Sequence, residues 1–155
     1  MPYHQLIAGL HENHEQIEWK DHFVWKDGVK IEPQAVIDDE LFNYLSDTFA
    51  WIRAQYPNGN WGDGFDPYAY SIVRDRRDLE RLREITSAWR TLFELGPEQI
   101  VLTGNYGWDG AEETQNGSYE RLRFEKSELT ESMTRLIEVV ETALKNGHYV
   151  IHFGI

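Results

Sequence analysis

The chain of 155 residues is long enough for one globular domain with a substantial core, and its six tryptophans and eight tyrosines argue against disorder. Its formal net charge of −12 makes nucleic acid and anionic membranes poor direct partners and favours a positively charged partner. The absence of cysteine excludes disulfide bonds and thiolate chemistry.

The first elements expected are a β-hairpin and a helix. Residues 17–31 predict the hairpin, because β-favouring residues flank the turn signal Lys26-Asp27-Gly28. Pro33 suits the first turn of a helix, which is expected to end at the turn residues 56–59. The acidic run Asp38-Asp39-Glu40 would lie near the positive end of this helix.

The second half of the chain predicts two longer helices and four strands. Residues 69–73 predict a short strand, and apolar spacing predicts a helix from Asp75 or Asp78 to Gly96. Residues 99–103 and 119–125 predict a hairpin with a long connection over about 104–118. A five-turn apolar stripe predicts a helix from Ser127 to Gly147, and a strand follows over 148–153.

This element order predicts an α+β fold. A single globular domain over residues 1–155 is expected, with a mixed or mostly antiparallel sheet of about five to six strands packed with three amphipathic helices. The pattern leaves the strand order and the oligomeric state open.

Two segments share an unusual composition of glycine, asparagine, tryptophan and aspartate: residues 58–64 and residues 104–110. Residues 32–73 carry seven acids against Arg53 alone, and residues 94–120 carry six acids and no base, so each region has a charge of −6. Aromatic rings supply contact area at low entropy cost, and carboxylates attract a basic partner. The residues expected to bind a partner are Trp61, Asp63, Phe65, Asp66, Tyr68, Tyr106, Trp108, Asp109, Glu112 and Glu113.

Other chemistry finds less support in the residue pattern. The glycines of the first segment lack a following lysine, which excludes a phosphate-binding loop, and Gly62 stands where a calcium loop needs a donor. The histidines His4, His11, His14 and His22 are interpreted as surface residues rather than metal ligands. His148 and His152 share one side of a strand and are interpreted as packing residues, with a catalytic pair as the alternative. No catalytic residue, metal or cofactor is therefore expected.

In size, acidity, lack of cysteine and element pattern, the chain resembles the cytosolic immunity proteins that protect bacteria from polymorphic or contact-dependent toxins. The segment Gly147-His-Tyr-Val-Ile-His-Phe-Gly154 also resembles the terminal strand of such domains. The resemblance implies a non-enzymatic inhibitor that covers the basic cleft of a toxin, with a nuclease domain as the expected class. It includes no diagnostic motif, so it implies no functional residue.

Two alternatives remain open. The protein could be a phage-type nucleic-acid mimic that inhibits a defence nuclease, or a small enzyme in which the carboxylates act on a polar or sugar substrate. The first ten residues lack a basic start and a long apolar run, so a cytoplasmic location without membrane attachment is expected.

Overall fold

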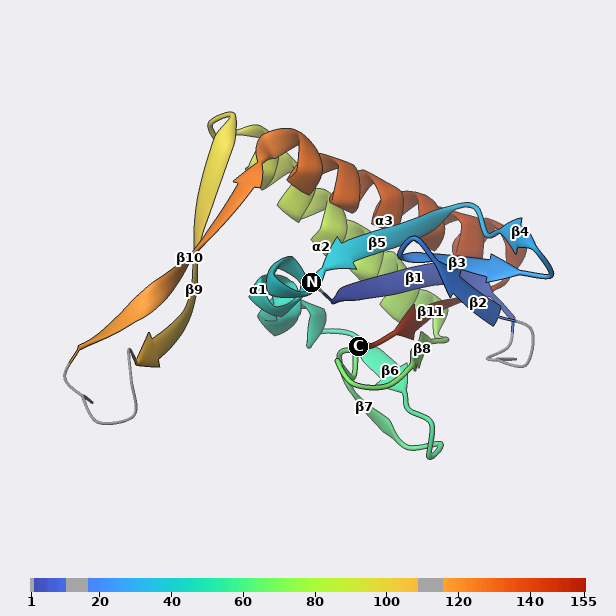
Figure 1. Cartoon of the computed structure of the whole chain (residues 1–155). Coiled ribbons are helices and arrows are strands. Elements are labelled where there is room, and N and C mark those ends of the chain that lie inside the picture. Colours follow the sequence, from blue (N-terminus) through green and yellow to red (C-terminus); the bar gives the residue numbers. More distant parts are fainter. Residues whose placement is uncertain (1, 11–16, 109–115) are drawn as a thin grey trace.

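The computed structural model describes residues 2–10, 17–108 and 116–155. Its centre is a six-stranded antiparallel sheet with the strand order β5-β1-β11-β8-β6-β7 (Figure 1). The strands are β1 (Tyr3–Gly9), β5 (Gln34–Asp38), β6 (Arg53–Gln55), β7 (Trp61–Asp63), β8 (Ser71–Val73) and β11 (Tyr149–Phe153). The first and last strands of the chain thus pair at the middle of the sheet.

Three helices pack against one face of this sheet: α1 (Asp39–Phe49), α2 (Arg76–Glu94) and α3 (Lys126–Asn146). Their apolar faces meet alternate residues of the strands, such as Leu6 and Val150, which are fully buried. Gly147 ends α3 in the left-handed conformation, with φ of 66°, which explains why a glycine stands there.

A small three-stranded sheet covers part of the opposite face. It consists of β2 (Ile17–Lys20), β3 (Phe23–Lys26) and β4 (Val29–Lys30). Val24 from β3 packs with Ile7 and Ile151, the residues that alternate with the helix-facing ones in β1 and β11. Both faces of these two strands are therefore buried, which explains their apolar composition.

The strands β9 (Gln99–Trp108) and β10 (Gly117–Glu125) form a separate two-stranded sheet. Figure 1 shows this hairpin, here called the arm, extending away from the helices and the main sheet. Ile100 and Leu122 near its base are buried, whereas most residues further along it are exposed. A two-stranded sheet has little stability of its own, so the arm depends on the apolar contacts at its base.

The α+β fold class predicted from the sequence is confirmed. The helix predicted from Pro33 is wrong in both its limits. Residues 34–38 form β5, because Ala35 and Ile37 pack in the sheet beside β1, and the helix begins at Asp39 with the Asp38 side chain as its N-cap. The helix ends at Phe49, before the predicted turn, and residues 53–55 form strand β6 with Ala54 buried.

The long connection predicted over 104–118 is also wrong, since β9 continues to Trp108 and β10 begins at Gly117. Cross-strand pairing overrides the turn-like glycine and asparagine content of this segment. Among the described residues, no helix is long and apolar enough to cross a membrane.

Candidate functional site

The register of the arm places several predicted residues on one face. Leu102 is opposite Leu122, and Tyr106 is opposite Tyr119. Because Tyr119 and Leu122 are three residues apart in β10, the two pairs lie on opposite faces of the two-stranded sheet. The register shifts between Tyr119 and Arg121, because a bulge in β9 sets Gly104 and Asn105 opposite the single residue Glu120. One face of the arm therefore carries Glu120 and Leu122, and the other carries Tyr119 with its partner Tyr106.

The aromatic residues near the tip form a compact group, here called the arm cluster, which consists of Tyr106, Trp108 and Tyr119. The Tyr106 ring lies edge-on to Trp108 at 5.1 Å and to Tyr119 at 5.0 Å between centroids. Their exposed fractions are 46%, 54% and 60%, which is high for side chains of this size. Such a group of exposed rings is typical of a binding surface.

Gly117 allows the Tyr106 ring to lie where it does. A Cβ atom added to Gly117 would stand 2.3–2.4 Å from three atoms of the Tyr106 side chain, an overlap that the ring could relieve only by moving. The glycine is thus required by the arm cluster rather than by backbone conformation.

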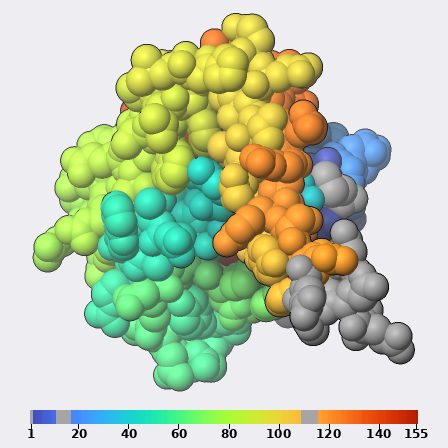
Figure 2. Space-filling model, turned by 90° about the vertical axis from the view of Figure 1, so that its left-hand side faces the viewer, coloured from blue at the N-terminus to red at the C-terminus, as the bar shows by residue number. Residues whose placement is uncertain are grey.

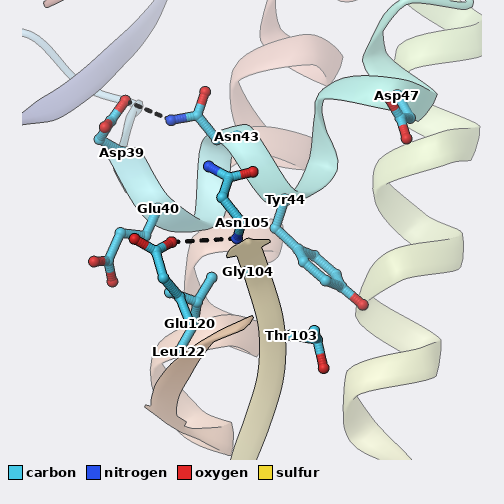
Figure 3. Close-up of a pocket in the computed structure, with 10 residues that line it drawn as sticks. All are labelled: Asp39, Glu40, Asn43, Tyr44, Asp47, Thr103, Gly104, Asn105, Glu120 and Leu122. Atoms are coloured by element: carbon cyan, nitrogen blue, oxygen red, sulfur yellow. Dashed lines mark hydrogen bonds between the residues drawn. The ribbon is translucent and has the colours of Figure 1, made fainter. Parts of the chain in front are cut away.

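Between the arm and α1 lies a hollow, here called the acidic groove (Figure 3). Its volume is about 470 Å³, and the described residues that line it include four acids and no lysine or arginine. They are Asp39, Glu40, Asn43, Tyr44, Asp47, Thr103, Gly104, Asn105, Glu120 and Leu122. Figure 2 shows the two walls meeting on one face of the molecule, with α1 in cyan and the arm in yellow and orange.

Local hydrogen bonds hold the walls of the groove. Glu120 accepts a bond of 3.2 Å from the Asn105 backbone N–H, which ties β10 to the bulge in β9. On α1, Asn43 donates to Asp39 over 3.1 Å. Gly104 is needed at the bulge, because an added Cβ would stand 2.9 Å from both Cβ and Oε2 of Glu120.

The acids of the groove repel one another. The pKa of Glu40 is raised above its ordinary value, first by burial and then by the negative charges of Asp38, Glu120 and Asp39. Because Glu120 belongs to the arm and Glu40 to α1, this repulsion acts across the groove. A cation bound between them would relieve it.

Beneath α1, two histidines extend from Asp39 into the core. His4 Nε2 donates to Asp39 Oδ1 over 2.8 Å, so its Nδ1 accepts from His152 Nε2 over 2.9 Å. Both histidines are fully buried, and His152 Nδ1 has no hydrogen-bond partner.

Burial lowers the pKa of both rings, and for His4 it outweighs the raising effect of its bond to Asp39. The pKa of His152 is lowered well below its usual value by burial and by the neighbouring His4. The expectation that His4 is a surface histidine is therefore wrong, because strand β1 places it inside the fold. Packing is observed for His152, whose ring stacks on Phe42 at 4.9 Å.

The first predicted segment has a different environment. Trp61 lies on β7 with the Arg53 guanidinium 5.7 Å from its ring centroid, and Asp63 is directly opposite Arg53 in the β6–β7 pair. Asp66 accepts a 2.9 Å bond from the Tyr68 N–H, and Tyr68 is 78% exposed. Arg53 thus places a positive charge beside Trp61 and Asp63, two residues that the sequence predicted to bind a basic partner.

Phe65 faces the interior. Its ring lies 5.7 Å from Phe42, 5.6 Å from Phe49 and 4.9 Å from His152, measured between centroids. These contacts give it a packing role in the structure. Asp109, Glu112 and Glu113 lie outside the described residues.

The two segments do not form one patch in the described part of the chain. Figure 1 shows β6 and β7 at the lower edge of the main sheet, whereas the arm extends on the far side of α1. The structure brings Tyr106 and Trp108 together with Tyr119 instead, on the face of the arm opposite to the groove residues Glu120 and Leu122.

Sequence reasoning missed the acids of the groove and Tyr119. The run Asp38-Asp39-Glu40 was interpreted as lying near the positive end of a helix, and Asp47 was seen only as part of the charge count. In β10, Glu120 and Leu122 alternate with Arg121 and Arg123, which hides the separation of charge between the two faces of the arm, and Tyr119 lies on the face of the arginines. The alternation itself was a usable signal, because it places Arg121 and Arg123 on the face opposite Leu122.

The described residues include no group of three or more histidines, acids or cysteines arranged to hold a metal ion. No family model, curated protein sequence or solved structure matches this chain.

Proposed function

We propose that this protein is a non-catalytic inhibitor that binds a basic protein, with a bacterial toxin nuclease as the expected partner. Binding uses the acidic groove and the arm cluster together, here called the arm surface. The observation that carries the proposal is a projecting arm with four acids in a groove without a lining cation on one side and three exposed aromatic rings on its other face.

Each half of this surface has a separate physical task. The carboxylates of Asp39, Glu40, Asp47 and Glu120 attract a cationic partner at long range and raise the association rate. The rings of the arm cluster lose water on binding and slow dissociation. A nuclease cleft is basic because it accepts phosphates, so it complements this surface in charge.

The projection of the arm also suits an inhibitor. Figure 1 shows the arm reaching beyond the helices, so it can enter a cleft that the body of the protein is too wide to enter. The base of the arm is anchored by buried Ile100 and Leu122, and the bond from the Asn105 N–H to the Glu120 carboxylate ties its strands together at the bulge. An arm that is ordered before binding loses less entropy when it binds.

The test is affinity capture from a lysate of the source bacterium, followed by titration calorimetry with the captured protein. The double variant Trp108→Ala, Glu120→Lys changes the arm surface, and the matched control Trp61→Ala, Asp63→Lys changes the β6–β7 hairpin in the same way. We expect the first to abolish binding and the second to leave it unchanged. Equal affinity of the arm variant and the unmodified protein would refute the proposal.

A small carboxylate-dependent enzyme is the second candidate, and one observation favours it. Glu40 has a raised pKa and faces Glu120 across a groove, as the acid of a two-carboxylate site would. The exposure of Glu40 and Glu120 in the groove favours binding over catalysis, because acid–base pairs act best where water is excluded. Glycosidase assays of the unmodified protein and of Glu40→Gln decide between an inhibitor and an enzyme. Turnover by the unmodified protein that the isosteric variant lacks would establish an enzyme.

A further inference from the structure

The strand β5 forms one edge of the main sheet and pairs with β1 on one side alone (Figure 1). Its ladder with β1 continues to a 3.2 Å bond from the Asp39 N–H to the Pro2 carbonyl. Hydrogen-bonded positions recur at every second residue of an antiparallel pair, so Ile37, like Asp39, bonds to β1. The backbone N–H and C=O of Val36 therefore point away from β1, to a side on which no strand of the described chain lies.

Two hollows follow this free edge one after the other and are here called the edge trough. The first, of about 290 Å³, lies between the small sheet and α3, and the second, of about 360 Å³, lies toward the base of the arm. Val36 of β5 and Ser132 of α3 line both hollows, so the two adjoin. Apolar wall comes from Phe23 in the first hollow and from Leu41 and Phe124 in the second.

The sequence of β5 leaves this edge open to a further strand. Proteins commonly protect a free edge with lysine, proline or a bulge, but Gln34–Asp38 contains neither residue and its register with β1 has no shift. The Gln34 side chain instead fastens the strand to β3, because it accepts from the Val24 N–H over 2.8 Å and donates to the Val24 carbonyl over 3.1 Å. The edge is thus ordered before anything binds to it, which lowers the entropy cost of binding.

We propose that an extended segment of a partner protein binds in the edge trough as a further strand beside β5. Backbone N–H and C=O groups at strand spacing complement those of another extended chain, which is the ligand that this edge selects. An antiparallel strand covers about 14 Å between Gln34 and Asp38, so five residues of the segment pair with the whole of β5. Alternate side chains of the segment then enter the hollows, whose walls favour apolar residues.

The charges around the trough favour a segment with basic ends over a second copy of this chain. The lining residues include four acids and three bases, and two of the bases, Lys30 and Arg135, are already held in ion pairs. Pairing of β5 with itself across two copies, centred on Val36, would place Glu32 of one copy opposite Glu40 of the other. Each copy also carries a net charge of −12, which opposes their association.

The edge trough is distinct from the acidic groove. In the described part of the chain, no residue that lines the groove also lines the trough. The inference therefore goes beyond the proposed function, and it stands whether or not the arm surface binds a basic toxin.

The probe for the trough is the synthetic peptide acetyl-Lys-Val-Thr-Val-Thr-Lys-amide, which has alternate apolar residues and basic ends. An NMR titration of the isotope-labelled protein follows each backbone amide. We expect the signals of Val36 and Asp38 to shift with a Kd below about 1 mM, and their hydrogen exchange to slow about tenfold or more at saturation.

Two N-methylated forms of the peptide separate strand pairing from general apolar binding. One form carries methyl groups on the two valine nitrogens, and the other carries them on the two threonine nitrogens. Successive N–H groups of an extended strand point to opposite edges, so only one of the two sets can face β5. We expect one form to bind about tenfold or more weakly and the other to keep the affinity of the parent peptide.

A matched pair of protein variants tests the edge itself. Because the Val36 N–H points away from β1, Val36→Pro removes a donor for the added strand and no hydrogen bond of the main sheet. Val36→Thr keeps this N–H and the branched side chain. We expect the proline variant to lose peptide binding and the threonine variant to keep it, with urea denaturation as the check on folding. The methylated peptides decide the matter if the proline variant does not fold.

No change at Val36 and Asp38 with about 5 mM peptide would overturn the inference. Equal binding of the two methylated peptides would also overturn it, because pairing along one edge requires them to differ. Protection of the same amides that rises with protein concentration, without peptide, would show a second copy in the trough and overturn the choice of occupant.

Discussion

Acidification should destabilise this protein before its carboxylates are protonated, because of the buried pair His4 and His152. Both rings have a pKa below the ordinary 6.5 in the folded state. Below about pH 6.5 the unfolded chain therefore binds protons at these positions that the folded chain does not. Above about pH 6.5 the pair does not change the free energy of unfolding with pH. Below it, the free energy of unfolding falls as the pH is lowered.

The structure sets the size of this effect. Each proton bound only by the unfolded chain changes the free energy of unfolding by about 1.4 kcal/mol per pH unit. Two histidines give a slope of at most about 2.7 kcal/mol per pH unit. The window extends downward from about pH 6.5 until the lowered pKa values are reached. His152 should contribute over a wider pH range than His4, because its pKa lies well below the ordinary value. A proton added at its Nδ1 would find no hydrogen-bond acceptor.

The assay is equilibrium urea denaturation at intervals between about pH 7.5 and pH 5.5, with the free energy extrapolated to water. His152→Phe should remove up to about 1.4 kcal/mol per pH unit from the slope while keeping the ring stack on Phe42. At pH 7 it should be less stable by about 1–3 kcal/mol, because His4 Nδ1 loses its donor.

A free energy of unfolding that does not fall between pH 6.5 and pH 5.5 would refute the reasoning. A slope of the free energy of unfolding against pH in His152→Phe equal to that of the unmodified protein would also refute it.

Four further outcomes are expected from single substitutions. Trp108→Ala should weaken partner binding by about 2 kcal/mol in calorimetry without lowering Tm, since the ring is exposed. Gly117→Ala should also weaken it, because the new methyl displaces the Tyr106 ring; an unchanged Kd would contradict that packing role. Glu40→Gln should raise Tm at pH 7 by about 1 °C, because folding raises the pKa of this carboxyl and its charge opposes folding; a lower Tm would contradict this. Phe65→Ala should cost about 3 kcal/mol in urea denaturation yet leave the partner Kd unchanged, and the reverse pattern would return Phe65 to the binding surface.

The sequence predicted the elements whose pattern is local. The helices α2 and α3 carry apolar residues at helical spacing over many turns, and Gly147 stops α3 where a left-handed residue is needed. The strands β8 and β11 are short apolar runs between clear turns, and they lie close to their predicted limits. The α+β class follows from these elements alone.

The elements that sequence analysis missed depend on partners distant in the chain. Strand β5 was assigned to a helix because Ile37 is spaced like a helical residue from Leu41, yet its pairing with β1 decides its conformation. Strands β6 and β7 have only three residues each and include Gly62. Their conformation comes from their place at the edge of the main sheet rather than from propensity.

For the candidate site, the sequence alone determined that this chain is acidic, rich in aromatic residues that could bind a partner, and free of the common catalytic motifs. It identified Tyr106 and Trp108, because composition marks such rings wherever they lie. Only the tertiary structure decided which charges accompany them. Packing of the arm against α1 brings Glu120 toward Glu40, and pairing of β6 with β7 gives Trp61 the cation Arg53. Electrostatic interactions depend on distance in space, which the order of residues along a chain does not specify.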